Sequence, residues 1–152
     1  MKRHVALQPL SRDHHHALHV AHRLRRASEH DARAAREDFL AFWHEQGRLH
    51  FRVEEEVLLP AFAAYGDPGD QRVVLMLIDH VRIRLQAQRL EQDPDPPVSD
   101  LHVLGAALDA HVRLEEREVF PLIEETLSPE AAEALTDAVL RAERPSRSTP
   151  DN

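Results

Sequence analysis

Two stretches of this chain repeat each other and carry residue types that bind metal ions. In residues 50–60 and 111–121, a His opens the stretch, a Glu follows four residues later as Glu54 or Glu115, and a Pro closes it. Residues four apart on an α-helix share a face, with Cβ atoms roughly 5–6 Å apart. Each stretch, if helical, therefore points one imidazole and one carboxylate in the same direction. That donor pair suits iron or zinc, with the carboxylate as a terminal or bridging ligand.

A second repeated pair of residues precedes each of these stretches. The pairs are Asp13-His14 and Asp79-His80, and an Arg-Leu pair follows each at a similar distance. The Asp-His pairs are 66 residues apart, and the His-x3-Glu stretches are 61 residues apart. The chain therefore reads as two copies of one two-helix unit. Two helices cannot enclose a core, whereas two packed copies can.

The composition excludes several classes of protein. The 152 residues are rich in Ala, Leu, Glu and Arg and include only four Gly, which favours helix over sheet. The net charge of −8 and the lack of a basic stripe argue against a nucleic-acid partner. No apolar run approaches the ~20 residues of a membrane span, and no signal peptide opens the chain, so we expect a cytoplasmic protein. Without Cys, thiolate metal sites and disulfides are excluded.

Helical periodicity predicts four long helices and one short one. The expected ranges are 10–27, 32–65, 71–91, 99–126 and 129–143. Short loops make neighbouring helices antiparallel, so we expect an all-α, up-down-up-down four-helix bundle with a short extra C-terminal helix. We expect a single domain over residues 1–144 and a disordered tail over 145–152.

Several local signals refine these ranges. Residues 1–9 are expected to be an extended lead-in, Ser99 to cap the fourth helix, and Ser128-Pro129 to start the fifth. Pro60 should bend the second helix or begin its end. The apolar stripes predict these core side chains: Leu10, Ala17, Leu18, Ala21, Leu24, Phe39, Phe42, Trp43, Phe51, Val57, Leu58, Phe62, Val74, Leu77, Ile78, Ile83 and Leu90.

In such a bundle, six residues of metal-binding types can meet at one level inside. They are His14, His50, Glu54, His80, His111 and Glu115. Burying all six would be costly unless something compensates their polar groups, and a metal centre would do so. Each His-x3-Glu pair alone is more simply an exposed ion pair, but the duplication favours a metal site. The repeat and the apolar stripe both select His14 over its neighbours His15 and His16.

The neighbouring polar residues receive simpler interpretations. Successive side chains on a helix point about 100° apart, so Glu55, Glu56 and Glu116 point away from the helix face that carries the candidate ligands. We expect them to be solvated or to support the ligands. Arg52 and Arg113 are expected in surface ion pairs, and His22 is the candidate for an extra ligand. A ferritin-like site would need Glu-x-x-His on two helices, and the chain contains no such motif.

These segments resemble the hemerythrin-like, or HHE cation-binding, family over about residues 10–125. The resemblance implies a four-helix bundle with a non-haem di-iron centre, bridged by an oxo or hydroxo group. It implies His14, His50, His80 and His111 as terminal ligands, and Glu54 and Glu115 as bridging carboxylates.

Two positions depart from the oxygen-carrying hemerythrins that this chain resembles. Those proteins have a further His four residues after the third-helix His, where this chain has Arg84. Their last carboxylate is an Asp five residues after its His, whereas Glu115 follows His111 by four. Both departures point away from reversible oxygen carriage.

The expected function is therefore that of a di-iron protein that reacts with or senses oxygen, nitric oxide or peroxide, or handles iron. Two alternatives stay open: an iron-release, repair or peroxide-consuming enzyme, and a regulatory helical domain with a different metal such as zinc. The expected partner is a small diatomic ligand or peroxide, with a protein partner or a homodimer left open. Neither nucleic acid nor a membrane is expected.

Overall fold

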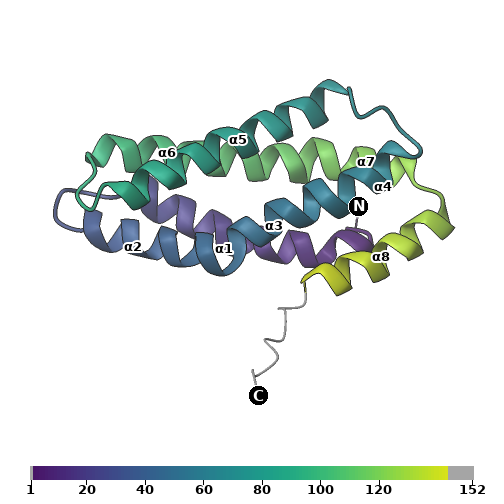
Figure 1. Cartoon of the computed structure of the whole chain (residues 1–152), viewed down its shortest axis with the longest axis horizontal. Helices are drawn as coiled ribbons and strands as arrows, with labels where there is room; N and C mark the ends of the chain where they lie inside the picture. The colour runs from purple at the N-terminus through teal and green to yellow at the C-terminus, as the bar shows by residue number, and fades with distance from the viewer. Residues whose placement is uncertain (1, 144–152) are drawn as a thin grey trace, which may run out of the picture.

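Four helical rods run alternately up and down through the molecule, and a fifth helix packs at one end (Figure 1). This computed structural model describes residues 2–143. The first rod contains the 3-10 turn η1 (Val5–Leu7) and α1 (Gln8–Arg25). The second contains α2 (Ala32–Phe42), η2 (Trp43–Gly47), α3 (Arg48–Val53), η3 (Glu54–Leu58) and α4 (Leu59–Ala63). The third is α5 (Gln71–Gln92), the fourth contains α6 (Val98–Leu114), η4 (Glu115–Val119) and α7 (Phe120–Thr126), and α8 (Pro129–Glu143) follows.

This architecture confirms the predicted all-α bundle with an extra C-terminal helix, and the described residues contain no strand. Ser128 marks the start of α8 as expected, because its Oγ accepts a hydrogen bond from the Ala131 N–H at 3.2 Å. The predicted tail over 145–152 lies outside the described residues. No helix in the described range is long and apolar enough to cross a membrane.

The N-terminal boundaries differ from the predicted ones. Residues 5–9 do not belong to an extended lead-in, since η1 begins at Val5 and α1 at Gln8. His4 is the residue that marks this early helix start, because its Nδ1 accepts a hydrogen bond from the Ala6 N–H at 3.0 Å and caps the turn. Pro9 is tolerated in the first turn of α1, where the missing N–H would have no partner in the helix.

Two further boundary predictions are corrected. The fourth helix begins at Val98 after Pro97, so Ser99 is not its N-cap. The second rod continues past Pro60 and stays helical to Ala63, two residues short of the predicted end at residue 65.

Two of the three wide, π-type turns in the described residues, η3 and η4, precede prolines. The Leu59 N–H bonds to the Glu54 carbonyl, and the Phe120 N–H bonds to the Glu115 carbonyl. Each of these two turns ends two residues before a Pro, whose ring would clash with the carbonyl four residues earlier in a regular α-helix. One extra residue in the turn changes that register. Both wide turns begin at the Glu of a His-x3-Glu pair, so the Pro and the carboxylate belong to one local distortion.

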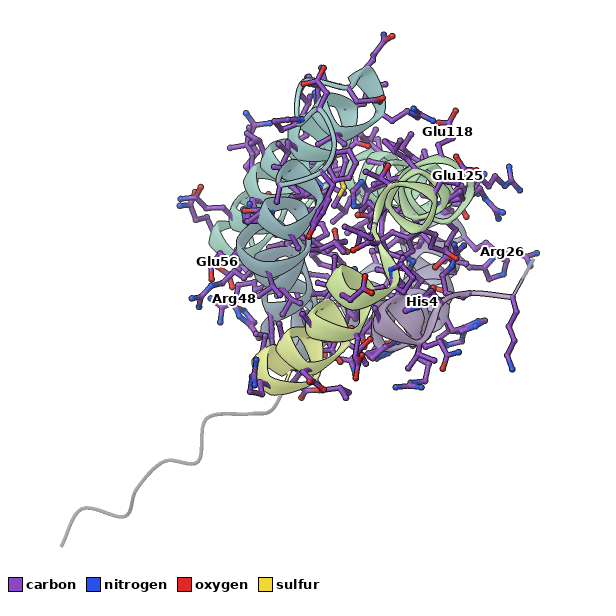
Figure 2. All side chains as sticks on the ribbon, turned by 90° about the vertical axis from the view of Figure 1, so that its right-hand side faces the viewer. His4, Arg26, Arg48, Glu56, Glu118 and Glu125 are labelled. Carbon is purple, nitrogen blue, oxygen red and sulfur yellow. The ribbon has the colours of Figure 1, made fainter. Side chains whose placement is uncertain are left out.

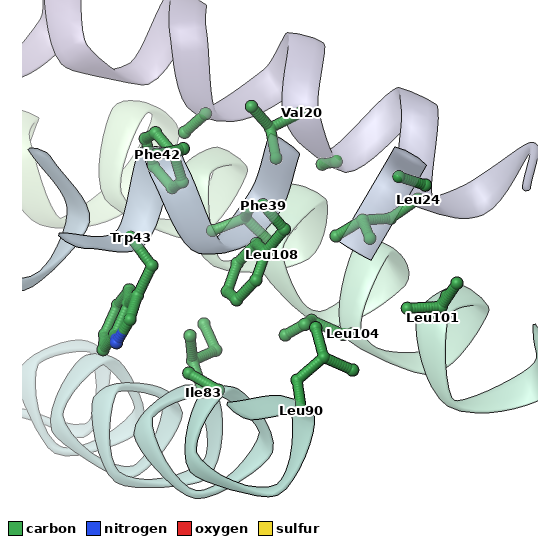
Figure 3. Close-up of a cluster of buried hydrophobic side chains, with 14 of the residues drawn as sticks. Val20, Leu24, Phe39, Phe42, Trp43, Ile83, Leu90, Leu101, Leu104 and Leu108 are labelled. Carbon is green, nitrogen blue, oxygen red and sulfur yellow. The ribbon is translucent and has the colours of Figure 1, made fainter. Parts of the chain in front are cut away.

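The core consists of two apolar clusters separated by a polar layer. The first fills one half of the bundle with α1, α2, α5 and α6 side chains, including Leu24, Phe39 and Leu104 (Figure 3). The second, built around Leu58, Met76 and other side chains, fills the other half and includes residues of η1 and α8. His14, His80 and Glu115 fall between the stretches of their rods that form these clusters, and His50, Glu54 and His111 lie within one residue of that boundary.

Most predicted core side chains are buried, but the α5 assignment is partly wrong. Val74, Leu77 and Ile78 are exposed, and Val73 and Met76 point inward instead. The prediction failed because α5 carries apolar residues on two faces, so periodicity alone does not select the inner one. Leu18 and Val57 are only partly buried.

Charged side chains occupy the outside of the bundle. Viewed from one end, the labelled Arg48, Glu56 and Glu118 point away from the core (Figure 2). Arg52 pairs with Glu56 at 3.4 Å and Arg113 pairs with Asp109 at 2.8 Å. Both pairs are spaced i,i+4 on the surface, as expected for the repeated arginines.

Candidate metal centre

All six predicted ligand residues lie together in the polar layer, and none is more than 6% exposed. They form two overlapping groups, in each of which the potential ligand atoms lie within 4.8 Å of one another. The groups are His14, His50, Glu54 and Glu115, and His80, His111, Glu54 and Glu115. The two carboxylates belong to both groups, as carboxylates that bridge two ions would.

The four imidazoles direct Nε2 toward these carboxylates. The Nε2 atoms of His14 and His111 lie 3.0 and 3.1 Å from Glu115 Oε1. His80 Nε2 lies 3.1 Å from Glu54 Oε2, and His50 Nε2 contacts the other oxygen of Glu54. The inward nitrogens and oxygens therefore converge on one small region.

Most of these inward atoms have no hydrogen-bond partner. The unpaired atoms are Nε2 of His50, His80 and His111, both carboxylate oxygens of Glu54, and Oε2 of Glu115. Buried polar atoms are nearly always satisfied in folded proteins, so a cluster of unpaired ones needs a physical explanation. Imidazole nitrogens and carboxylate oxygens that face one another are a donor set for metal ions, and the residues present fit such a group.

Each imidazole is held from behind by a carboxylate. The Nδ1 atoms of His14 and His80 lie 2.6 Å from Glu116 and Glu55. The Nδ1 atoms of His50 and His111 lie 3.0 Å from Asp13 and 3.3 Å from Asp79. A carboxylate accepts a hydrogen bond from Nδ1–H, which leaves the Nε2 lone pair facing inward and raises the basicity of the ring.

These pairs explain the internal repeat of the sequence. The Asp of each Asp-His pair binds the His of its own unit, as Asp13 does on α1 with His50 on α3. The second Glu of each stretch binds the His of the other unit, as Glu55 on η3 does with His80 on α5. Glu55 and Glu116 are therefore partners of the predicted ligands rather than solvated residues. Glu56 remains exposed.

Basic and hydroxyl side chains in turn hold Glu116 and Glu55 in place. Glu116 accepts hydrogen bonds from Ser11 Oγ at 2.7 Å and from Arg3 Nη2 at 2.9 Å. Partial burial would raise the pKa of Glu116, but hydrogen bonds from His14, Ser11 and Arg3 lower it to about 2. Arg84 Nη1 lies 2.8 Å from Glu55. Sequence reasoning missed Arg3, because nothing in its spacing marks a contact with a residue more than a hundred positions away.

The electrostatics of the cluster favour bound cations. Burial would lower the pKa of His80, but its carboxylate neighbours Glu115, Glu54 and Glu55 raise it to about 11. Burial likewise opposes protonation of His111, but the Glu115 charge and the Asp79 hydrogen bond raise its pKa to about 9. Protons and metal ions therefore compete for the same inward nitrogens.

A cavity of about 20 Å³ adjoins one side of the cluster. Its walls include these apolar side chains beside His14, His50 and His111: Ala17, Phe42, Trp43, Leu108 and Val112. A space of this size holds about one water-sized molecule. Phe51 also lines this cavity, and its ring stacks on His80 with centroids 3.8 Å apart. The Arg84 guanidinium lies 5.6 Å from the Phe51 ring.

The remaining histidines stay out of the cluster. His22 is exposed and does not join either group, so the structure does not support it as an extra ligand. His15 and His19 are exposed as well. His16 Nδ1 lies 2.8 Å from Gln46 Oε1 at the surface.

An all-α bundle with two buried His and Glu groups that share their carboxylates is a metal-binding domain. The model of the hemerythrin HHE cation binding domain matches residues 5–123, and the chain belongs to that family. Neither the curated proteins nor the solved structures include a match to this chain.

Proposed function

We propose that this protein binds two irons in the buried cluster and uses them to react with a small oxidant or diatomic ligand. His14 and His50 would hold one iron, His80 and His111 would hold the other, and both irons would share Glu54 and Glu115. The observation that carries it is the convergence of unpaired buried ligand atoms into two groups that share both carboxylates.

The donor set favours iron over zinc. Each ion would receive two imidazole nitrogens and one oxygen from each shared carboxylate. Structural zinc sites are closed and tetrahedral, commonly with thiolates, and this chain has no Cys. A six-coordinate ion with four protein donors and one shared oxo or hydroxo bridge would keep roughly one open position. Such a pair of irons supplies one-electron redox chemistry and binding positions for a small ligand.

The cavity beside the cluster would give small molecules a route to the irons. It lies at His14 and His50 and admits a molecule the size of water or oxygen, and its mostly apolar walls disfavour larger polar molecules. Phe51, which lines the cavity, also covers the imidazole of His80. The carboxylates behind each Nδ1 hold the rings in place as charge changes at the irons.

Arg84 supports oxidation or sensing over reversible oxygen carriage. It stands where the oxygen carriers that this chain resembles have a further His, and it pairs instead with Glu55. A guanidinium stays protonated and does not bind a metal. The iron at His80 would therefore have one imidazole fewer and one more position for exogenous anions or peroxide.

Stopped-flow absorption tests this function. The anaerobically reduced protein is mixed with oxygen and then degassed, and we expect conversion to the ferric state within minutes without recovery. Full recovery of the reduced spectrum on degassing would contradict this proposal and indicate oxygen storage as the function. Steady consumption of added peroxide would instead support the enzyme alternative.

A cavity variant separates ligand access from metal binding. Ala17→Val adds methyl groups at the cavity wall, so we expect azide to bind the ferric protein at least tenfold more slowly while both irons stay bound. Ala107→Val is the matched control, because Ala107 is partly buried on α6 but does not line the cavity. Equal azide rates in the two variants would contradict the proposed entry route.

A further inference from the structure

The outer face of α5 carries an exposed apolar surface that the metal centre does not explain. Its large hydrophobic side chains are 37–66% exposed: Val74, Leu75, Leu77, Ile78, Val81 and Leu85. Scattered exposed hydrophobic residues are ordinary, but six within twelve positions of one helix form a continuous patch. In Figure 1, the N-terminal half of α5 lies at the upper edge of the bundle.

The spacing of this patch is that of a helix-pairing seam. Four of its residues, Val74, Ile78, Val81 and Leu85, follow one another at intervals of four, three and four. The inner face of the same helix has its own row at matching intervals, which includes Val73, Met76, His80 and Ile83. Alternating steps of three and four are the pattern with which paired helices interdigitate. α5 thus has one seam for its own bundle and a second seam that faces outward.

The outer seam is complementary to itself in the antiparallel direction. A two-fold axis midway between Ile78 and Val81 would place these two residues opposite each other, and Val74 opposite Leu85. The same axis would place Asp70 opposite Arg89 of the second copy, at both ends of the contact. Arg82 and Arg84 would lie opposite Leu77 and Leu75, which their aliphatic stems can cover. A two-fold contact of this kind uses the same patch on both subunits.

We propose that α5 is the interface of a homodimer in which two copies of this helix pair antiparallel about an axis between Ile78 and Val81. A lipid surface fits the patch less well. Helices that lie on membranes combine a broad apolar face with aromatic residues and lysines, and α5 contains neither Phe, Trp, Tyr nor Lys. One helix pair is a smaller contact than the about 800 Å² per partner of a standard interface, so we expect a weak dimer whose population depends on concentration.

Sedimentation equilibrium of the full chain over the micromolar range tests the dimer. We expect a concentration-dependent dimer for the unmodified chain and at least tenfold weaker association for Val81→Glu, which would bury a carboxylate opposite Ile78. Val103→Glu is the matched control, because Val103 is an exposed valine on α6 outside the patch, and it should associate normally. A monomer at every concentration, or an unchanged dimer in Val81→Glu, would overturn the proposal. Binding of the monomer to anionic phospholipid vesicles through the same patch would also overturn it.

Cysteine cross-linking tests the antiparallel register. The chain has no native Cys, so a single introduced thiol gives an unambiguous product. Val74→Cys and Leu85→Cys, one of them carrying an affinity tag to distinguish masses, should form a disulfide with each other when mixed. Each variant alone should cross-link little, since identical residues would lie about 16 Å apart along the axis. Efficient self-cross-linking of either variant would indicate parallel pairing and contradict the proposed register.

Discussion

A carboxylate contacts the Nδ1 atom of each buried histidine, and this contact leaves the inward-facing Nε2 atoms available to a metal. A lone i,i+4 pair such as His50 and Glu54 would bring two groups to one helix face and no more. Asp13 adds a fixed tautomer, because it accepts a hydrogen bond from the Nδ1–H of His50, which leaves the Nε2 lone pair free for a metal. The same relation holds at all four histidines, so the ligand geometry rests on ten side chains rather than six.

The carboxylates behind the histidines should therefore control metal affinity. Asp79→Asn removes the charge that faces His111 Nδ1, and we expect affinity for the metal to fall by about 10–100-fold, as is usual when such a partner is lost. Competition with a chelator measures this change. Asp109→Asn, which removes a carboxylate from a surface ion pair, is the control and should keep full affinity. Equal affinities in the two variants would contradict the role of Asp79.

Metal binding should release protons near neutral pH. In the apoprotein the pKa of His111 is about 9 and that of His80 about 11, above the 6.5 of an ordinary His. Their protonated forms therefore stabilise the folded apoprotein fully below about pH 6.5, and this stabilisation is lost as the pH rises through 9 toward 11. At pH 7 a metal must displace these protons. Calorimetric titration in two buffers of different ionisation enthalpy should show more than one proton released per chain. Heats that do not depend on the buffer would contradict these pKa values.

The elements that position the site were predictable in type but less so in detail. The repeated His-x3-Glu-x5-Pro spacing predicted which helix faces would meet, and the six residues do lie together. The wide turns at Glu54 and Glu115 were not predicted, because a one-residue change of hydrogen-bond register leaves the apolar pattern almost unaltered. The Pro in each stretch was the available signal, and it had been expected to bend or end the helix.

Contacts between distant segments account for the rest of what sequence reasoning missed. The Arg3 contact with Glu116 depends on how the N-terminal turn lies over η4, which no local pattern encodes. The cavity beside His14 depends on the joint placement of α1, η2, α3 and α6. The inner face of α5 was misassigned because both of its faces are apolar.

The close packing of α1 against α6 gives a prediction at the scale of these elements. A Cβ added to Gly105 would lie 2.8 Å from the Ala21 carbonyl oxygen and from the Leu24 side chain. Gly105→Ala should therefore destabilise the fold by about 1–3 kcal/mol through overpacking, without changing the number of metals bound. Ala106→Ser adds one atom at the next, exposed position and should cost little. Denaturant unfolding compares the two, and equal stabilities would show that the helices can separate at no cost.

At the scale of the whole molecule, the polar layer of six buried residues divides an otherwise apolar core. Two apolar clusters lie on either side of it and provide the burial that holds the rods together. A layer of six buried polar residues would weaken such a core unless a bound ion compensates it. A metal that binds only the folded chain also adds stability by mass action. The fold and the metal centre should therefore depend on each other.

The most direct test of the di-iron centre is the metal content of the purified chain, measured together with its visible absorption spectrum. We expect two irons per chain and an oxo-bridge absorption band. Glu54→Ala and Glu115→Ala should each lose more than one iron, because each carboxylate would bind both ions. Glu56→Ala, an exposed neighbour, should keep two. Two tightly bound irons in either the Glu54→Ala or the Glu115→Ala variant, or zinc in place of iron in the unmodified protein, would contradict the proposed di-iron centre.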